Sequence, residues 1–383
     1  MAHVPDGRRG TDFRPGASFP SVGEGAGSLR HPALQGGNAP PVRRARAAPR
    51  RGRVPRRGVF DRRHRHLSLG RAPRVAPGGA RRLSEREALV LHHRRAARGG
   101  ARHGGAAVTF AIERRHLPGE EPLELLSCVN GSGGGRAPLL FVHGAYVGAW
   151  CWAEYFLPWF AERGYEAHAL SFRGHGKSGG HDRLHGFGLG DYVDDLEVAI
   201  QALPRPPVVI GHSMGALVVQ KYLERGTGTL PAVVHVCPVP PFGLLPSTFH
   251  LAFFRPGLFS EINALASGHR ASRTALAEAL FSRSVESERI DRFYGRMQRE
   301  SQRALMDMTI WNLPQLWRMQ RVPALVLGAE HDALIAPSLA QSAASLLGAK
   351  YGLLDGMGHA VMLETAWERA AGAVLEWIER ATM

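Results

Sequence analysis

Hydrophobic and polar positions follow two different periods from about residue 108 onward. Short, almost continuous apolar runs, such as residues 138–142 and 207–210, alternate with longer stretches in which apolar residues recur every three or four positions. The short runs are typical of buried strands and the longer stretches of amphipathic helices. Strands that alternate with helices predict βαβ units, so the expected fold class is α/β, a mostly parallel central sheet flanked by helices.

The pattern also places the individual elements. Residues 241–321 break the rhythm with helices and loops, and we expect this insertion to form a cap over the carboxyl ends of the strands, where open α/β sheets place their sites. Strands are expected at residues 109–112, 123–129, 138–142, 167–172, 207–210, 232–236, 322–327 and 350–354. Helices are expected at residues 150–162, 191–203, 215–223, 337–347 and 362–380.

The first 107 residues differ in composition from the rest. Arg, Gly and Pro account for 51 of them, and they contain three Phe and neither Trp nor Tyr. A segment with so few large apolar groups cannot offset its ordering entropy by burial, so we expect residues 1–107 to be a disordered tail. Residues 108–383 are long enough to form one large domain with a single core.

Charge is divided in the same way. The chain has a formal net charge of +15, but residues 1–107 carry +18 and residues 108–383 carry −3. Three interpretations of the basic segment stay open. It could be an arm that binds nucleic acid, although it lacks interleaved aromatic residues for stacking, or a transit peptide, although such a peptide would be richer in Ser. In the third interpretation the start is misassigned, and translation begins near Val108. We expect no nucleic-acid binding by the folded domain.

Three cysteines, Cys128, Cys151 and Cys237, have unrelated spacings. They therefore indicate neither a disulfide framework nor a zinc site. No run of 18 apolar residues predicts a membrane span, and the amino terminus lacks the apolar run of a secretory signal. We expect a cytoplasmic protein; the sequence does not indicate its oligomeric state.

The candidate nucleophile is Ser213, in the pentapeptide Gly211-His212-Ser213-Met214-Gly215 between a predicted strand and a predicted helix. A serine on such a sharp turn exposes its hydroxyl, and the glycines on either side relieve crowding. The helix amino terminus that follows presents free N–H groups to a developing oxyanion. The strand and helix context favours catalysis over a simple glycine-rich turn.

A base and an acid follow in the order that this pentapeptide requires. His359 comes after the last predicted strand and Asp332 after the preceding one, so both are expected at the edge of the sheet that carries Ser213. Glu330 is the rival acid, but it lies nearer the strand end. We expect a catalytic triad of Ser213, Asp332 and His359.

Oxyanion stabilisation needs a second backbone donor besides the N–H of Met214. The loop after residues 138–142 begins with His143-Gly144-Ala145, and we expect the Ala145 N–H to supply it. For His143, His175 and His212, the favoured roles are structural: they fill space and make hydrogen bonds near turns.

Four segments together resemble the α/β-hydrolase fold superfamily, and the resemblance covers residues 108–383. These are Leu140–Ala145 (LFVHGA), Ser171–Gly179 (SFRGHGKSG), Gly211–Gly215 (GHSMG) and Gly358-His359. The sequence GHSMG followed by ALVVQ is similar to lysophospholipase-like and monoacylglycerol-lipase-like serine esterases. The residues around Trp150 are also similar to the plant methylesterase and hydroxynitrile-lyase branch.

The resemblance implies a serine hydrolase that cleaves carboxylic esters through an acyl-enzyme and needs no cofactor or metal. Lipid-like or small apolar acyl esters are the expected small-molecule substrates. Two alternatives stay open: the same triad used for cofactor-free perhydrolysis, acyl transfer or C–C or C–CN cleavage, and a non-catalytic binding protein. The expected substrate contacts are Tyr146, Trp150, Phe242 and Trp311.

Overall fold

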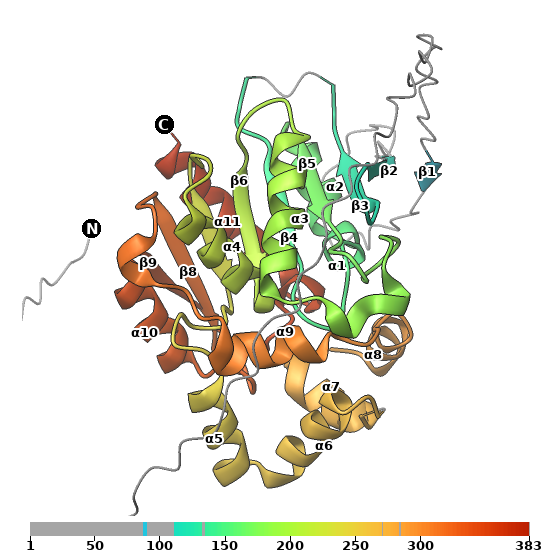
Figure 1. Cartoon of the computed structure of the whole chain (residues 1–383), viewed down its shortest axis with the longest axis vertical. Coiled ribbons are helices and arrows are strands. Elements are labelled where there is room, and N and C mark those ends of the chain that lie inside the picture. Colours follow the sequence, from blue (N-terminus) through green and yellow to red (C-terminus); the bar gives the residue numbers. More distant parts are fainter. Residues whose placement is uncertain (1–86, 90–110, 132–134, 270, 283–284, 383) are drawn as a thin grey trace, which may run out of the picture. The chain divides into compact units, whose positions relative to one another are not determined.

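A nine-stranded sheet organises the part of the chain that the computed structural model describes, residues 87–89, 111–131, 135–269, 271–282 and 285–382 (Figure 1). The strand order is β1-β2-β3-β5-β4-β6-β7-β8-β9. Pairing is antiparallel from β1 to β5 and parallel from β5 to β9. The expected α/β fold class with a mostly parallel sheet is therefore confirmed.

The strands are β1 (Glu87–Leu89), β2 (Ile112–Leu117), β3 (Leu123–Cys128), β4 (Leu139–Val142), β5 (Ala167–Leu170), β6 (Val208–His212), β7 (Val233–Val236), β8 (Ala324–Ala329) and β9 (Lys350–Leu354). The α-helices are α1 (Trp150–Ala153), α2 (Phe156–Glu162), α3 (Leu189–Gln201), α4 (Met214–Arg225), α5 (Leu245–Phe254), α6 (Pro256–Ala266), α7 (Arg273–Leu280), α8 (Ser287–Tyr294), α9 (Gln302–Met306), α10 (Pro337–Leu347) and α11 (Trp367–Ala381). None of the helices in the described ranges combines the length and apolar character that a membrane span requires.

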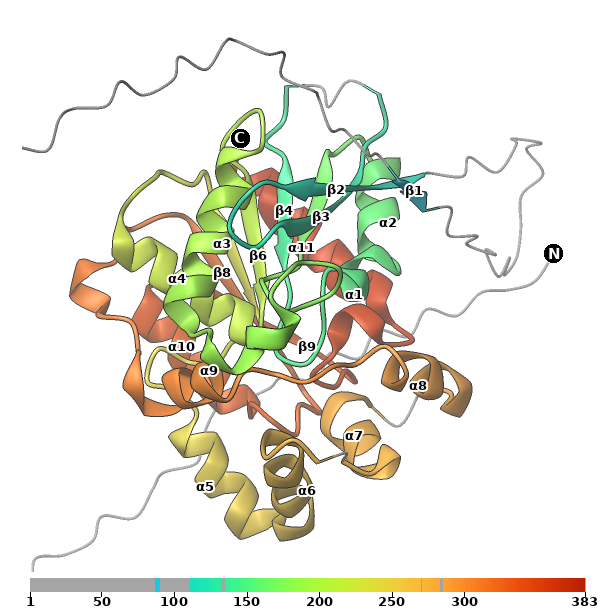
Figure 2. The same cartoon turned by 45° about the vertical axis from the view of Figure 1, so that its right-hand side comes forward.

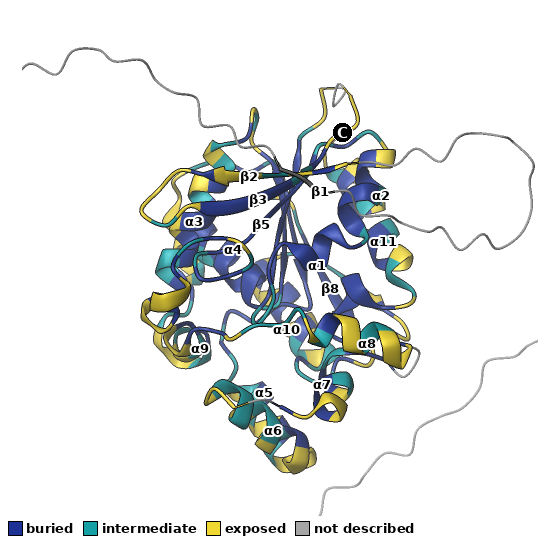
Figure 3. Cartoon of the chain, turned by 90° about the vertical axis from the view of Figure 1, so that its right-hand side faces the viewer, coloured by how far each residue is buried: buried dark blue, intermediate teal, exposed yellow. Residues whose placement is uncertain are grey.

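The central strands are covered on both faces. Every residue of β4, β5, β6 and β7 is buried, as expected for parallel strands between two helical layers. One apolar core lies between the sheet and α1, α2 and α11, and a second lies against α3 and α4. Figure 3 shows the buried sheet between these two groups of helices.

Three predicted elements differ from those observed. The first strand was expected at residues 109–112, whereas β2 spans Ile112–Leu117; residues 109 and 110 lie outside the described residues. The helix expected at 150–162 is two helices, because Pro158 has no N–H to bond the carbonyl of residue 154 in a continuous helix. The helix expected from residue 362 begins at Trp367, because Glu364 is extended after a short 3₁₀ turn.

The helices between β7 and β8 lie together beyond one end of the sheet. Figures 1 and 2 show α5, α6, α7 and α8 grouped there, and we call residues 241–321 the cap segment. Of the amino-terminal segment, Glu87–Leu89 form β1 and pair with β2, although we expected residues 1–107 to be disordered. The rest of that segment lies outside the described residues.

Candidate active site

Ser213 lies between β6 and α4 in a backbone conformation that a side chain rarely adopts, with φ 51° and ψ −115°. The turn is held by hydrogen bonds from Ser213 N to Val236 O (3.0 Å) and from Val239 N to Ser213 O (3.2 Å). Residues that are held in such strained conformations cluster at functional sites.

Two glycines make this turn possible by close approach. A Cβ at Gly211 would lie 2.8 Å from Ala216 Cα, and one at Gly215 would lie 2.8 Å from Val142 O and still nearer to His143 O. All these neighbours are main-chain atoms, so no flexible side chain can move aside. The start of α4 therefore packs directly on the loop that follows β4.

Gly215→Ala is expected to lower the free energy of unfolding by about 2–3 kcal/mol, because the added methyl overlaps backbone that cannot relax. Urea unfolding followed by circular dichroism measures this loss. Gly372→Ala in α11 is the matched control, since beyond the neighbouring backbone of its own helix no described atom lies within 4 Å of the added Cβ. That control is expected to be neutral or to stabilise by about 0.5–1 kcal/mol. A G215A protein as stable as wild type would contradict this packing.

His359 and Asp332 form a hydrogen-bonded pair. The distance from His359 Nδ1 to Asp332 Oδ2 is 2.7 Å, and both side chains are almost completely buried. Asp332 Oδ1 accepts the N–H groups of Leu334 and Ile335, each at 2.8 Å, which fixes the carboxylate. Glu330, the rival acid, has a half-exposed side chain that accepts the N–H of Gly356 instead.

The residue before Ser213 bonds to the backbone of His359. His212 Nε2 donates to the carbonyl of His359 at 2.9 Å, so its Nδ1 carries no proton in the neutral ring. Burial lowers the pKa of His212 well below its ordinary value, and the nearby His359 lowers it further. His212 is thus a neutral ring that links the turn of Ser213 to the loop of His359.

The loop after β4 runs directly beside Ser213. A Cβ at Gly144 would lie 3.1 Å from Ser213 Cβ. His143 Nδ1 donates to Gly144 O (2.7 Å) and its Nε2 accepts the N–H of Phe172 (3.1 Å). Burial lowers the pKa of His143 to about 3, so this ring is neutral. Because C=O and N–H point opposite ways in a trans peptide, this bond also orients the Ala145 N–H.

A cavity of about 260 Å³ joins these groups to the cap segment. Ser213, His359, Ala145, Tyr146 and Trp150 line it, together with residues of α5, α6, α7 and α8. No Asp, Glu, Lys or Arg is among the described residues that line it.

Two of the four expected substrate contacts are not among the residues that line this cavity. Phe242 does not line this cavity, and Trp311 is 74% exposed at the surface of the cap segment. Several other cap aromatic residues also face outward, including Phe249, Phe253 and Trp317. The abundance of aromatic residues in the sequence did not indicate which of them turn inward.

One group of side chains of metal-ligand type occurs among the described residues. Ligand atoms of Cys237, Asp332 and His359 lie within 4.8 Å of one another. The hydrogen bond between Asp332 and His359, and the contact of the Cys237 thiol with the Asp332 carboxylate, account for this grouping. Burial raises the pKa of the Cys237 thiol well above its ordinary value, which disfavours the thiolate that a metal needs.

The sequence analysis missed the partner of the loop after β4. Glu300, in the cap segment, accepts the N–H of Tyr146 at 3.1 Å and is itself 3% exposed. A single glutamate in a helical insertion belongs to no motif, and 154 residues separate it from Tyr146. No signal in the sequence could have identified this contact.

Comparisons with known proteins agree with this architecture. Residues 139–373 match a family model described as the alpha/beta hydrolase family. Over 82 residues the chain is 38% identical to a monoacylglycerol lipase of Mycolicibacterium smegmatis, a match that covers 20% of this chain and 28% of that protein. The chain thus matches less than a third of that relative's length.

Two solved structures show the same fold at low sequence identity. A putative aryl esterase from Burkholderia cenocepacia is 22% identical, with a TM-score of 0.55 over 70% of this chain and 98% of the other. A bromoperoxidase from Bacillus anthracis is 20% identical, with a TM-score of 0.55 over 70% and 99% of the respective chains.

Proposed function

The chain belongs to the alpha/beta hydrolase family, and from that premise we propose that it is a serine hydrolase that cleaves carboxylic esters. One observation carries the proposal. Ser213 and His359 line the same cavity, and His359 is hydrogen-bonded to the buried carboxylate of Asp332. A nucleophile, a base and a group that orients the base are the arrangement that acyl transfer to serine requires.

In the first half of the proposed reaction, Ser213 Oγ attacks the ester carbonyl carbon while His359 Nε2 takes the hydroxyl proton. The carbonyl oxygen becomes an oxyanion, and the N–H groups of Ala145 and Met214 are placed to bind it. Among the described residues, no acceptor takes a hydrogen bond from either N–H. The C–O bond to the alcohol then breaks, and the alcohol leaves with the proton from His359.

In the second half, His359 takes a proton from water and the resulting hydroxide attacks the acyl carbon. The second tetrahedral intermediate expels Ser213 Oγ, which regains its proton from His359, and the acid leaves. Asp332 holds the ring with Nδ1 protonated and stabilises the imidazolium that forms in both halves.

The cavity wall supports an uncharged, apolar substrate. Leu251, Ile262, Leu276, Phe281 and Phe293 from the cap segment line it. A charged group in such a cavity would lose its hydration without gaining a partner. The partial similarity to a monoacylglycerol lipase is in keeping with apolar acyl esters.

Esters of p-nitrophenol test both the activity and this preference. The hexanoate is expected to be hydrolysed with a kcat/KM about 100-fold higher than the mono-ester of adipate, which has the same chain length and a terminal carboxylate that would be buried. Initial rates at pH 7.5 over a range of concentrations measure the ratio. Equal kcat/KM values would contradict the apolar assignment. Negligible turnover of esters from acetate to decanoate would instead favour another reaction of the same triad.

A further inference from the structure

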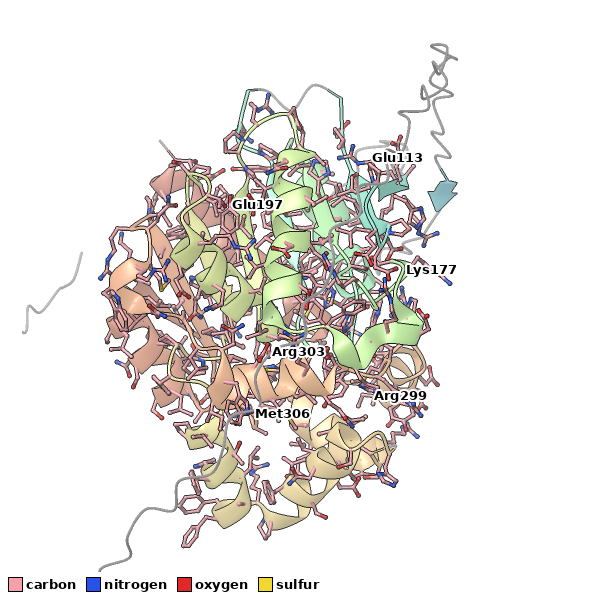
Figure 4. All side chains as sticks on the ribbon, viewed as in Figure 1. Glu113, Lys177, Glu197, Arg299, Arg303 and Met306 are labelled. Atoms are coloured by element: carbon pink, nitrogen blue, oxygen red, sulfur yellow. The ribbon has the colours of Figure 1, made fainter. Side chains whose placement is uncertain are left out.

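Glu300 is a buried carboxylate outside the proposed triad, two residues before the start of α9 (Figure 4 labels the adjacent Arg299). It accepts four hydrogen bonds, so both of its oxygens are satisfied. Oε2 accepts Tyr146 N (3.1 Å) and His175 Nε2 (3.0 Å), and Oε1 accepts Tyr192 Oη (3.1 Å) and Ser301 N (2.7 Å).

His175 is the positive partner of this carboxylate. Its Nε2 faces Glu300 and its Nδ1 faces the carbonyl of Arg173 at 3.1 Å. Neither a carboxylate nor a carbonyl can donate, so both ring nitrogens carry protons. Glu300 raises the pKa of His175 although burial opposes this, and His175 with the backbone donors lowers the pKa of Glu300. Both pKa shifts favour the charged forms, an imidazolium and a carboxylate buried together as an ion pair.

Residues 298–300 hydrogen-bond both backbone groups of Tyr146, its N–H and its carbonyl. Glu300 accepts the N–H of Tyr146, and the N–H of Gln298 donates to the carbonyl of Tyr146 at 2.9 Å. Tyr146 needs such support because its φ is +66°, a conformation unfavourable for a bulky side chain. It directly follows Ala145, the proposed oxyanion donor.

Gln298 also fixes the segment to the loop after β5. Its side-chain oxygen accepts the N–H of Gly176 (2.8 Å), and its side-chain nitrogen donates to Gly174 O (2.8 Å). The imidazole of His175, between these two glycines, bonds Glu300. Residues 298–300 are therefore hydrogen-bonded to two loops of the main domain, the loop after β4 and the loop after β5.

We infer that Glu300 is a positioning residue that sets the Ala145 N–H at the distance and angle needed to bind the oxyanion, an inference that rests on the proposed function. Its charge is held in place by His175, and it acts through the N–H of Tyr146. A carboxylate is required because all four partners donate. The cap segment thus supplies a part of the catalytic loop's support as well as the wall of the cavity.

Glu300→Gln tests this role, with Tyr192→Phe as the matched control. The amide has one acceptor and one donor end, so it cannot satisfy all four donors, and it removes the charge that holds His175. Tyr192→Phe deletes one hydrogen bond to the same carboxylate but leaves its charge and the Tyr146 contact. Steady-state kinetics with p-nitrophenyl hexanoate and inhibition by an alkyl trifluoromethyl ketone, which forms a tetrahedral oxyanion on serine, are measured for both.

E300Q is expected to lower kcat about 10- to 100-fold, with KM changed less than about twofold, because a displaced oxyanion donor acts on the transition state. Affinity for the trifluoromethyl ketone should fall by the same factor, and Y192F should change both by less than about threefold. A folded E300Q protein with wild-type kcat, an equal loss in Y192F, or a loss of kcat with unchanged ketone affinity would each overturn the inference.

Two other outcomes, a failure of E300Q to fold and a failure of the proposed function, can be told apart from a failure of this inference. If E300Q does not fold, Glu300→Asp keeps the charge beside His175 but withdraws the carboxylate from Tyr146 by one methylene. The same joint loss of kcat and ketone affinity is then expected, and wild-type values in a folded E300D would overturn the inference. If the wild-type protein neither hydrolyses the ester nor forms a fluorophosphonate adduct on Ser213, the proposed function fails and this inference fails with it.

Discussion

Ser213→Ala is expected to lower kcat for p-nitrophenyl hexanoate by about 10⁶-fold, because alanine has no hydroxyl to form the acyl-enzyme. It should also remove the fluorophosphonate adduct that intact-mass spectrometry detects on the wild-type protein. Alanine keeps the Cβ, so the strained turn at φ 51° is unchanged. The free energy of unfolding should therefore stay within about 0.5 kcal/mol of wild type.

Ser342→Ala is the matched control for this substitution. Ser342 is exposed on α10, and among the described residues its hydroxyl bonds only the carbonyl of Ser338, one turn earlier in the same helix. It should keep wild-type turnover and labelling. Undiminished hydrolysis or labelling in a folded S213A protein would refute catalysis by this serine, and with it the proposed mechanism.

Asp332→Asn is expected to lower kcat by about 10⁴-fold without unfolding the protein. The N–H groups of Leu334 and Ile335 both donate to Oδ1, so they hold the amide oxygen of the asparagine at that position. The NH₂ group then faces His359 Nδ1 and forces it to accept, which moves the ring proton to Nε2. A ring protonated at Nε2 cannot take the proton of Ser213.

Glu330→Gln separates this effect from a general loss of negative charge near His359. Glu330 lies two residues before Asp332 in the chain, and its side chain is half exposed. Among the described residues, the N–H of Gly356 is the only hydrogen-bond donor to it. We expect E330Q to retain kcat within about twofold, because His359 Nδ1 is bonded to Asp332 and not to this half-exposed carboxylate. A larger loss in E330Q than in D332N, measured with the same ester, would show that the acid has been assigned to the wrong residue.

The local pattern of the sequence was sufficient for the fold class and for most elements of the sheet. Buried parallel strands read as short apolar runs because helices cover both of their faces, as for β4 and β6. The turn around Ser213 was also predictable, because only glycine fits where a Cβ at residue 211 or 215 would meet backbone atoms. The order of Ser213, Asp332 and His359 predicted one common edge of the sheet, since parallel strands end there together.

Other features depend on contacts between distant residues. The break in the alternation of strands and helices predicted an insertion at residues 241–321 but not which of its side chains face inward. Trp311 points to the surface, while Phe293 lines the cavity. The sequence favoured Asp332 over Glu330 only by its distance from the strand end, whereas the structure shows which of the two is hydrogen-bonded to His359. The support of Tyr146 by Glu300 has no local signature.

The sequence by itself thus determined the α/β architecture, the strained serine turn and the set of candidate catalytic residues, because these follow from local periodicity, from glycine at close approaches and from chain order. Only the tertiary structure decided which carboxylate orients His359, which cap residues face the cavity, and that Glu300 and His175 form a buried ion pair beside Tyr146. The contacts of Glu300 join residues more than 100 positions apart, and the other two features depend on the direction in which side chains point; local patterns encode neither.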